Sequence, residues 1–324
     1  MDKVRLGNTD LVVSKVGFGV LTMGESRLNL PLVEGAELIR YALNQGINLF
    51  DTAENHGTYK YLKTALENTN YEPIISGKSL KHSYDGMNDA IEEARRELDR
   101  DVIDIFMLQE LTSVKEYTFR AGAIEALVDA KAAGKIRYIG VSTHHVDVAE
   151  MVARKLEIDV LFPLINYVGL GIRDNRAFDG TGNREDMAAA IRKAASEGKA
   201  IFGMKAFGGG NLTGSYKDAL DYVYGLKGIQ SMILGFGKKS EIDDIVAYLN
   251  GTMDREYVPD ISKKRIFIDH SDCESCGACI QRCPSKAIYN DEEGMPNVNQ
   301  EICIKCGYCA PICPARAIIM IDKR

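Results

Sequence analysis

The sequence lacks several features that would indicate a membrane or nucleic acid as a partner. No stretch of its 324 residues approaches the ~20 consecutive apolar residues that span a bilayer. Lysine and arginine form no long run and the net charge is −6, so no nucleic acid and no anionic membrane is expected as a partner. The first residues, MDKVRLGNTDLVV, lack the basic and then apolar pattern of a signal peptide. We therefore expect a soluble, cytoplasmic protein.

Cysteine is absent before position 273, and all eight cysteines follow. The segments CESCGACIQRCPSKAI, from Cys273, and CIKCGYCAPICPARAI, from Cys303, repeat with a period of 30 residues. Each has the spacing C-x2-C-x2-C-x3-C-P. An even number of cysteines is compatible with disulfides, but this spacing and the cytosolic character of the chain argue against them.

The spacing is typical of iron–sulfur ligation, in which three cysteines surround one cluster and the fourth reaches the other cluster. Over about 58 residues the tail resembles the bacterial-type ferredoxin with two [4Fe–4S] clusters. The resemblance assigns one cluster to Cys273, Cys276, Cys279 and Cys313, and the other to Cys283, Cys303, Cys306 and Cys309. The alternative is a pair of four-cysteine zinc sites, which usually show two C-x2-C pairs and a longer spacer.

Before the cysteines, short apolar runs alternate with helical patterns. The candidate strands are KVGFGVL, INLFDTA, PIISGK, DIFMLQ, YIGVST, VLFPLIN, AIFGMK and SMILGFG. Continuous apolar strands indicate burial on both faces, and hence a parallel sheet covered by helices. Eight such units predict an α/β fold, a (β/α)8 TIM barrel, with a doubly wound open sheet as the alternative. We predict a barrel over residues 1–250, a linker over 251–266 and a small α+β ferredoxin-like domain over 267–324.

TIM barrels carry their chemistry at the carboxyl ends of the strands, and further motifs lie there. They are GFGVLTMG, GINLFDTAENHG, GKIRYIGVST, MKAFGGGNL and ILGFGKKSEIDDI. Together they resemble the aldo-keto reductase family, and within it the members that carry a ferredoxin-like tail. The resemblance implies a TIM barrel, NAD(P)H-dependent reduction of a carbonyl, and a catalytic tetrad of Asp, Tyr, Lys and His.

Half of that tetrad is changed in this chain. The resemblance assigns Asp51 and Lys78 to two positions, but His56 stands at the Tyr position and Gln109 at the His position. Because imidazole has a reference pKa of about 6.5, His56 could donate or accept a proton instead of the tyrosine. Tyr59 is a second candidate for this role, and Gln109 can hydrogen-bond a substrate. Asp51 and Lys78 could also form only a structural ion pair.

The residues expected at the cofactor are also altered. Ser142 matches the family, whereas Thr143, Phe162 and Met204 replace residues that bind the carboxamide or stack on the nicotinamide. The residues that could still cradle a phosphate are Gly208, Gly209, Gly237, Lys238, Lys239 and Ser240. NAD(P)H is therefore compatible with the sequence, and a flavin would fit the same loops, although no flavin-binding segment is apparent.

Two neighbouring features complete the predicted mouth of the barrel. Strand alternation predicts that Glu110, next to Gln109, points away from the barrel interior. The loop YVGLGIRDNRAFDGTGNRED follows the sixth strand and is either a lid or a solvated surface loop.

Nicotinamides donate electrons in pairs, whereas each cluster passes one electron at a time. The first hypothesis is therefore an iron–sulfur oxidoreductase that acts on a small carbonyl, alcohol or enone, with a ferredoxin or another redox protein as partner. The alternatives are an NAD(P)H-dependent carbonyl reductase with structural clusters, and a non-enzymatic electron-transfer or redox-sensing protein on an inactive barrel. Because clusters near a surface are oxygen-sensitive, we expect an anaerobic cytoplasm.

Overall fold

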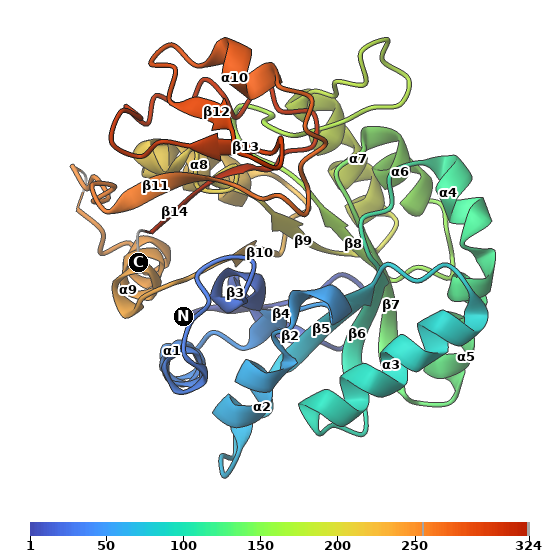
Figure 1. The fold of residues 1–324 in the computed structure, drawn as a ribbon. Helices are drawn as coiled ribbons and strands as arrows, with labels where there is room; N and C mark the ends of the chain where they lie inside the picture. The colour runs from blue at the N-terminus through green and yellow to red at the C-terminus, as the bar shows by residue number, and fades with distance from the viewer. Residues whose placement is uncertain (255, 323–324) are drawn as a thin grey trace.

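The computed structural model describes residues 1–254 and 256–322, and eight strands of this part form a closed parallel barrel (Figure 1). In sequence order they are β3 (Val16–Gly19), β4 (Leu49–Asp51), β5 (Ile74–Ser79), β6 (Ile103–Leu108), β7 (Ile136–Thr143), β8 (Val160–Pro163), β9 (Ala200–Met204) and β10 (Ser231–Leu234). The last strand, β10, pairs with both β9 and β3, so the sheet closes on itself. The predicted TIM barrel is confirmed, and the open doubly wound sheet is excluded.

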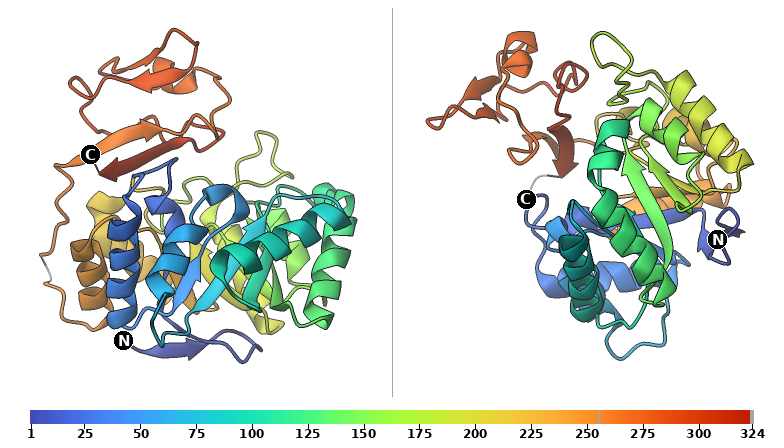
Figure 2. Two further views of the ribbon diagram at one scale, coloured as in Figure 1. Left: turned by 60° about the horizontal axis from the view of Figure 1, so that its bottom comes forward. Right: turned by 90° about the vertical axis from the view of Figure 1, so that its right-hand side faces the viewer.

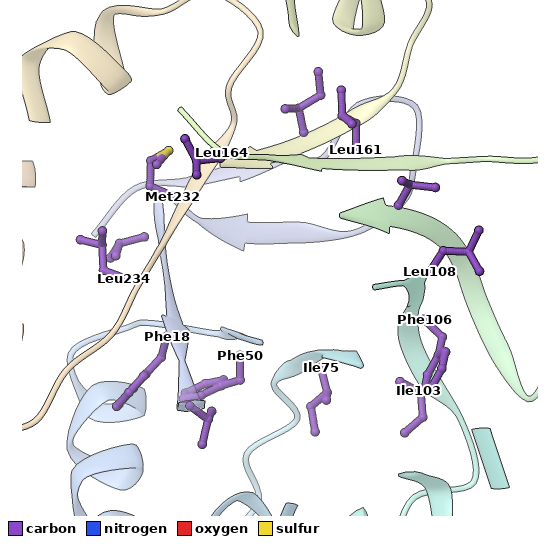
Figure 3. Packing of buried hydrophobic residues seen from close by; sticks show 14 of the residues in the cluster. Phe18, Phe50, Ile75, Ile103, Phe106, Leu108, Leu161, Leu164, Met232 and Leu234 are labelled. Carbon is purple, nitrogen blue, oxygen red and sulfur yellow. The ribbon is translucent and has the colours of Figure 1, made fainter. Parts of the chain in front are cut away.

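Helices cover the outside of the barrel (Figure 1). They are α1 (Leu32–Asn44), α2 (Tyr59–Leu66), α3 (Tyr84–Leu98), α4 (Val114–Phe119), α5 (Ala121–Ala132), α6 (Val146–Val152), α7 (Arg184–Ser196), α8 (Tyr216–Gly225) and α9 (Lys239–Leu249). Outward side chains of the strands, including Phe18, Phe50, Ile75 and Phe106, pack in the layer beneath the helices (Figure 3). Inward side chains fill the barrel, which explains why the strands are apolar without alternation. Within the described residues, no helix is both long and apolar enough to cross a membrane.

A hairpin that the sequence analysis did not predict closes one end of the barrel. It consists of β1 (Lys3–Arg5) and β2 (Val12–Ser14), which pair antiparallel. Leu6, Leu11 and Val13 of this segment pack against the inward side chains of the barrel strands. Figure 2 shows the hairpin and the carboxy-terminal tail at opposite ends of the barrel.

The tail contains two small antiparallel sheets and one short helix. Its elements are β11 (Lys264–Ile268), α10 (Ala278–Arg282), β12 (Ile288–Asn290), β13 (Pro296–Val298) and β14 (Ile318–Asp322). Strand β11 pairs with β14, and β12 pairs with β13. The sequence repeat recurs in the backbone, because Gly277 and Gly307 both adopt left-handed φ angles, of 71° and 76°.

Strand β11 begins inside the segment that the sequence analysis assigned to the linker, residues 251–266. The charged pair Lys264 and Arg265 favoured a linker in the sequence. Ile266 and Ile268 of the same strand are nevertheless buried in the core of the tail. This segment therefore adds a strand to the tail instead of only joining it to the barrel.

The tail lies on the end of the barrel at which the strands have their carboxyl ends (Figure 2). Arg27, in the loop after β3, forms an ion pair with Asp269. Arg316 Nη2 donates a hydrogen bond to Glu110 Oε1, after β6, at 2.8 Å. Arg173, in the long loop after β8, donates to the carbonyl oxygen of Pro314. The tail is thus attached to several loops that surround the mouth of the barrel.

Candidate active site and cluster-binding loops

A buried ion pair lies at the carboxyl ends of β4 and β5. The two strands are neighbours in parallel register, so Lys78 reaches across to Asp51. Lys78 Nζ donates to Asp51 Oδ2 and to the carbonyl oxygen of Thr52, each at 2.7 Å, and Ser76 Oγ donates to Asp51 Oδ1 at 3.2 Å. Burial lowers the pKa of Lys78 from its usual value, and the Asp51 carboxylate offsets this only in part. Asp51 and Lys78, which the sequence predicts to share one site, are in contact in the structure.

His56 ends the short 3-10 helix η2 (Glu54–His56), and Gly57, with a φ of 62°, turns the chain into α2. Its Nδ1 atom is enclosed and has no hydrogen-bond partner among the described residues. Burial, and after it the positive charges of Lys78 and Arg27, lower the pKa of His56 well below the ordinary value of 6.5. The imidazole is therefore neutral at pH 7 and can accept a hydrogen bond there.

We expect His56 to stay neutral as the pH is lowered through 6.5, because protonation would bury a third positive charge beside Lys78 and Arg27. The unfolded chain binds this proton at a higher pH than the folded chain, so stability is full above 6.5 and falls as the pH decreases towards the lowered pKa. NMR titration of the histidine ring signals measures the pKa, and denaturant unfolding at several pH values measures the stability. His56→Gln should remove this part of the pH dependence, and His82→Gln, a change at an exposed position, should not. A His56 ring that titrates at or above 6.5 would contradict the expectation.

Gln109 and Tyr59 have different surroundings. Gln109, directly after β6, donates from Nε2 to Asn55 Oδ1 at 3.1 Å, next to His56, while its buried Oε1 has no partner among the described residues. Tyr59 lies at the start of α2, and its ring packs in the apolar layer between barrel and helices. Burial and then the carboxylate of Glu93 raise the pKa of Tyr59, so this phenol stays protonated.

Two charged residues at the mouth have left-handed backbones that the sequence did not reveal. Glu110 has a φ of 48° and Lys205, after β9, a φ of 64°. This conformation ends strand alternation at Glu110, whose carboxylate contacts Arg316 of the tail. Burial and the charge of Arg27 lower the pKa of Lys205. Such conformations are rare outside glycine and are concentrated at functional sites.

The residues predicted at the nicotinamide have mostly intramolecular partners. Ser142 Oγ accepts a hydrogen bond from the backbone N–H of Glu110 at 2.8 Å. The Phe162 ring lies 4.7 Å from that of Phe202, and Met204 Sδ lies 3.3 Å from His144 Nε2.

The residues predicted at the phosphate lie beside the tail or at the start of α9. Gly209 accepts a hydrogen bond from the backbone of β14, and Gly208 and Gly209 both have left-handed φ angles. Lys238 Nζ lies 3.5 Å from Asp322 Oδ2, while Lys239 Nζ stands 5.3 Å from the centre of the Tyr41 ring. Gly237 donates its backbone N–H to Glu241 Oε2, and Ser240 is exposed.

The eight cysteines of the tail are free thiols that line two hollows. Cys273, Cys276, Cys279 and Cys313 line one hollow. Cys283, Cys303, Cys306 and Cys309 line the other. These sets are the ones that the ferredoxin resemblance implied. Within the described residues, no group of three or more His, Cys, Asp or Glu side chains is arranged to hold a single metal ion.

The chemistry of the hollows fits a cationic cluster. Burial, and then the nearby thiols of Cys303 and Cys306, raise the pKa of Cys309 to about 12, so a thiolate there needs a positive partner. Backbone amides already point at sulfur, because Ala287 donates its N–H to Cys283 Sγ at 3.2 Å. Hydrogen bonds of this kind stabilise thiolate ligands of iron–sulfur clusters.

Comparison with known proteins bears on both parts of the chain. Residues 15–224, more than half of its length, match the sequence model of the Aldo/keto reductase family. The chain belongs to the aldo/keto reductase family. Residues 265–314 match the model of a 4Fe-4S dicluster domain, so this aldo/keto reductase carries an iron–sulfur module.

The relatives of this aldo/keto reductase chain are distant. It is 27% identical over 187 residues to L-galactose dehydrogenase from Arabidopsis thaliana, covering 54% of this chain and 58% of the relative. It is 26% identical over 176 residues to the uncharacterized oxidoreductase YqkF from Bacillus subtilis (strain 168), covering 49% and 54%. The chain thus spans about half the length of the curated relatives it matches.

Solved aldo-keto reductase structures share the barrel. The putative aldo-keto reductase PA4992 from Pseudomonas aeruginosa superposes with a TM-score of 0.64 and 22% identity, over 78% of this chain and 96% of that chain. The holo form of aldo-keto reductase AKR11C1 from Bacillus halodurans gives a TM-score of 0.61 and 19% identity, over 80% and 92%. At these identities the similarity supports the fold.

Proposed function

We propose that the chain is an iron–sulfur oxidoreductase that acts on a small carbonyl, alcohol or enone at the mouth of the barrel. The observation that carries this proposal is the attachment of the cysteine-bearing tail to the same end of the barrel as the Asp51–Lys78 pair. Asp269, four residues before Cys273, pairs with Arg27, whose charge acts on both His56 and Lys205. The candidate catalytic side chains and one hollow of the tail therefore lie at the same end of the barrel.

The eight cysteines would hold two [4Fe–4S] clusters, which supply one-electron transfer when bound. The hollow lined by Cys273 and Cys313 is flanked by contacts with the barrel, because Pro314 accepts a hydrogen bond from Arg173. Reduction of a carbonyl to an alcohol consumes two electrons and two protons. The partner that this stoichiometry favours is a one-electron redox protein of the ferredoxin class, which would act twice for each substrate.

Within the barrel, the side chains would bind and polarise the substrate. The Lys78 ammonium can stabilise negative charge that develops on a substrate oxygen, because its position is fixed by Asp51 and Thr52. The neutral His56 imidazole can form a hydrogen bond to the substrate, while its lowered pKa makes it a weak base near neutral pH. The unpartnered Oε1 of Gln109 can accept a hydrogen bond from a substrate hydroxyl. Tyr59 would support this site from the layer behind it.

The proposal is tested under anaerobic conditions with reconstituted protein. Dithionite should bleach the broad visible absorbance of the clusters, and after its removal a small carbonyl or enone should restore the colour, with EPR as the check. Bleaching by NADH or NADPH alone would mean that the barrel binds nicotinamide and passes its electrons to the clusters. Steady NAD(P)H-dependent turnover in variants without cluster ligands would favour the reductase with structural clusters. Reduced clusters that no carbonyl or enone reoxidises, together with oxidised clusters that no alcohol reduces, would sink the proposal and favour the inactive barrel.

A further inference from the structure

Strand β14 of the tail lies directly on the loop that follows β9. The backbone N–H of Met320 donates to the carbonyl oxygen of Gly209 at 2.8 Å, and Asn211 Nδ2 donates to the carbonyl oxygen of Ile318 at 3.0 Å. A Cβ atom on Gly210, whose φ is 90°, would collide with the carbonyl oxygen of Met320. The glycines of this loop therefore allow the backbone of β14 to approach closely, as they would allow a phosphate to approach.

The start of α9 is also occupied by groups of this chain. A helix N-terminus attracts anions, and here Glu241 Oε2 accepts the backbone N–H of Gly237 at 2.8 Å. The carboxylate of Asp322, the last residue of β14, lies 3.5 Å from Lys238 Nζ. Lys264, from β11, lies between the two acids, 3.0 Å from Glu241 and 3.5 Å from Asp322. Two carboxylates thus stand where the sequence placed a phosphate.

At both ends of the expected dinucleotide site, the residues that would bind the cofactor already have partners within the chain. At the nicotinamide end, Phe162 packs on Phe202, and Met204 contacts His144. At the phosphate end, an incoming anion would meet Glu241 and Asp322 at close range and would have to break the hydrogen bond between Met320 and Gly209. Because Lys264 pairs with both carboxylates and Lys238 with Asp322, an incoming phosphate would have to displace these acids, and the backbone groups would lose their partners. The residues present therefore do not fit NAD(P)H while the tail is in this position.

We propose that β14 takes the place of the dinucleotide phosphates, so that the docked tail and NAD(P)H are mutually exclusive. The loops after β9 and β10 form the docking site of the iron–sulfur module. This inference goes beyond the proposed function, since it concerns which groups occupy these loops and not which substrate reacts.

The first test uses the reconstituted full-length protein without oxygen. Calorimetric titration with NADH and with NADPH should show no saturable binding at millimolar concentrations, and hydrogen exchange at the Met320 amide should stay unchanged. Saturable binding accompanied by faster hydrogen exchange at Met320 would also support competition between β14 and NAD(P)H for the same loops. Saturable binding with the Met320 amide still protected would overturn the proposal.

The second test releases the strand by changing its anchors. Asp322→Asn together with Glu241→Gln removes both carboxylates, and Met320→Pro removes the N–H that bonds to Gly209. We expect faster exchange in β14 and NADPH binding at least tenfold tighter than in the wild type. Glu197→Gln, which neutralises an exposed carboxylate after α7, is the matched control and should change neither readout. If β14 is released, as exchange would show, and NADPH still fails to bind, these loops are not a dinucleotide site and the proposal fails. The substrate-driven reoxidation assay is independent of this result.

Discussion

Replacing Cys276 with serine is expected to remove about half of the iron and acid-labile sulfide of the reconstituted protein, since one of two clusters loses a ligand. Cys276 is exposed and lines the hollow that also contains Cys273, Cys279 and Cys313. A serine hydroxyl is a far weaker ligand than a thiolate for iron. The other hollow keeps its four cysteines, so the remaining half of the visible absorbance should persist.

The same variant should lose substrate-driven reoxidation by a hundredfold or more. Residues that flank the hollow of Cys276 contact the barrel, through Asp269 and Pro314. Cys306→Ser, in the other hollow, should cause a similar loss of iron, with slower reduction by an external protein donor. Gln281→Ala, an exposed change on α10, is the control and should retain both iron and reoxidation. An iron content in Cys276→Ser equal to that of the wild type, or protein that binds zinc with no visible absorbance, would contradict the ligand assignment.

The barrel could be predicted from the sequence because its physical cause is local. Each strand is a short apolar run, and each must be buried on both faces by the barrel core and a helix. The contact between Asp51 and Lys78 followed from the same reasoning, since the carboxyl ends of neighbouring parallel strands lie together. The cysteine sets that line the two hollows could be predicted because the spacing C-x2-C-x2-C-x3-C-P is typical of iron–sulfur ligation.

The remaining features depend on contacts between distant parts of the chain. No local pattern indicates that Glu110 and Lys205 have left-handed backbones, and this changes where their side chains point. The hairpin of β1 and β2 is too short to give a periodic pattern. The position of the tail depends on pairs such as Arg27 with Asp269, which are far apart in the sequence.

The position of the tail changes the interpretation of the residues that were predicted to bind a phosphate. Glycines and lysines after β9 and β10 are equally suited to an anion and to a closely packed strand with an acidic end. Only the structure distinguishes these occupants, because β14 comes from a segment about 110 residues further along the chain than Gly209. The same composition can therefore serve a cofactor in one protein and a domain interface in another.

Substituting one member of the Asp51–Lys78 pair is expected to lower the free energy of unfolding more than a substitution at any other single site in the barrel. Lys78→Met leaves the Asp51 carboxylate buried at 5% exposure without its cation. Removing one partner of a buried pair typically costs about 3–5 kcal/mol, since the other charge is left uncompensated. Urea unfolding, monitored by circular dichroism, measures this cost. Lys81→Met is the matched control, because Lys81 is about half exposed and its pair with Glu54 should contribute at most about 1 kcal/mol.

The double variant Asp51→Asn with Lys78→Met separates a catalytic role from a structural one. It removes both charges, so most of the lost stability should return. If Lys78 stabilises charge on the substrate, reoxidation of the reduced clusters by substrate should stay roughly 10²–10⁴-fold slower in both single variants and in the double variant. If the pair only supports the fold, the rate should recover together with the stability. Recovery of both in the double variant would remove Asp51 and Lys78 from the reaction and leave His56 and Gln109 as the remaining candidates at the mouth of the barrel.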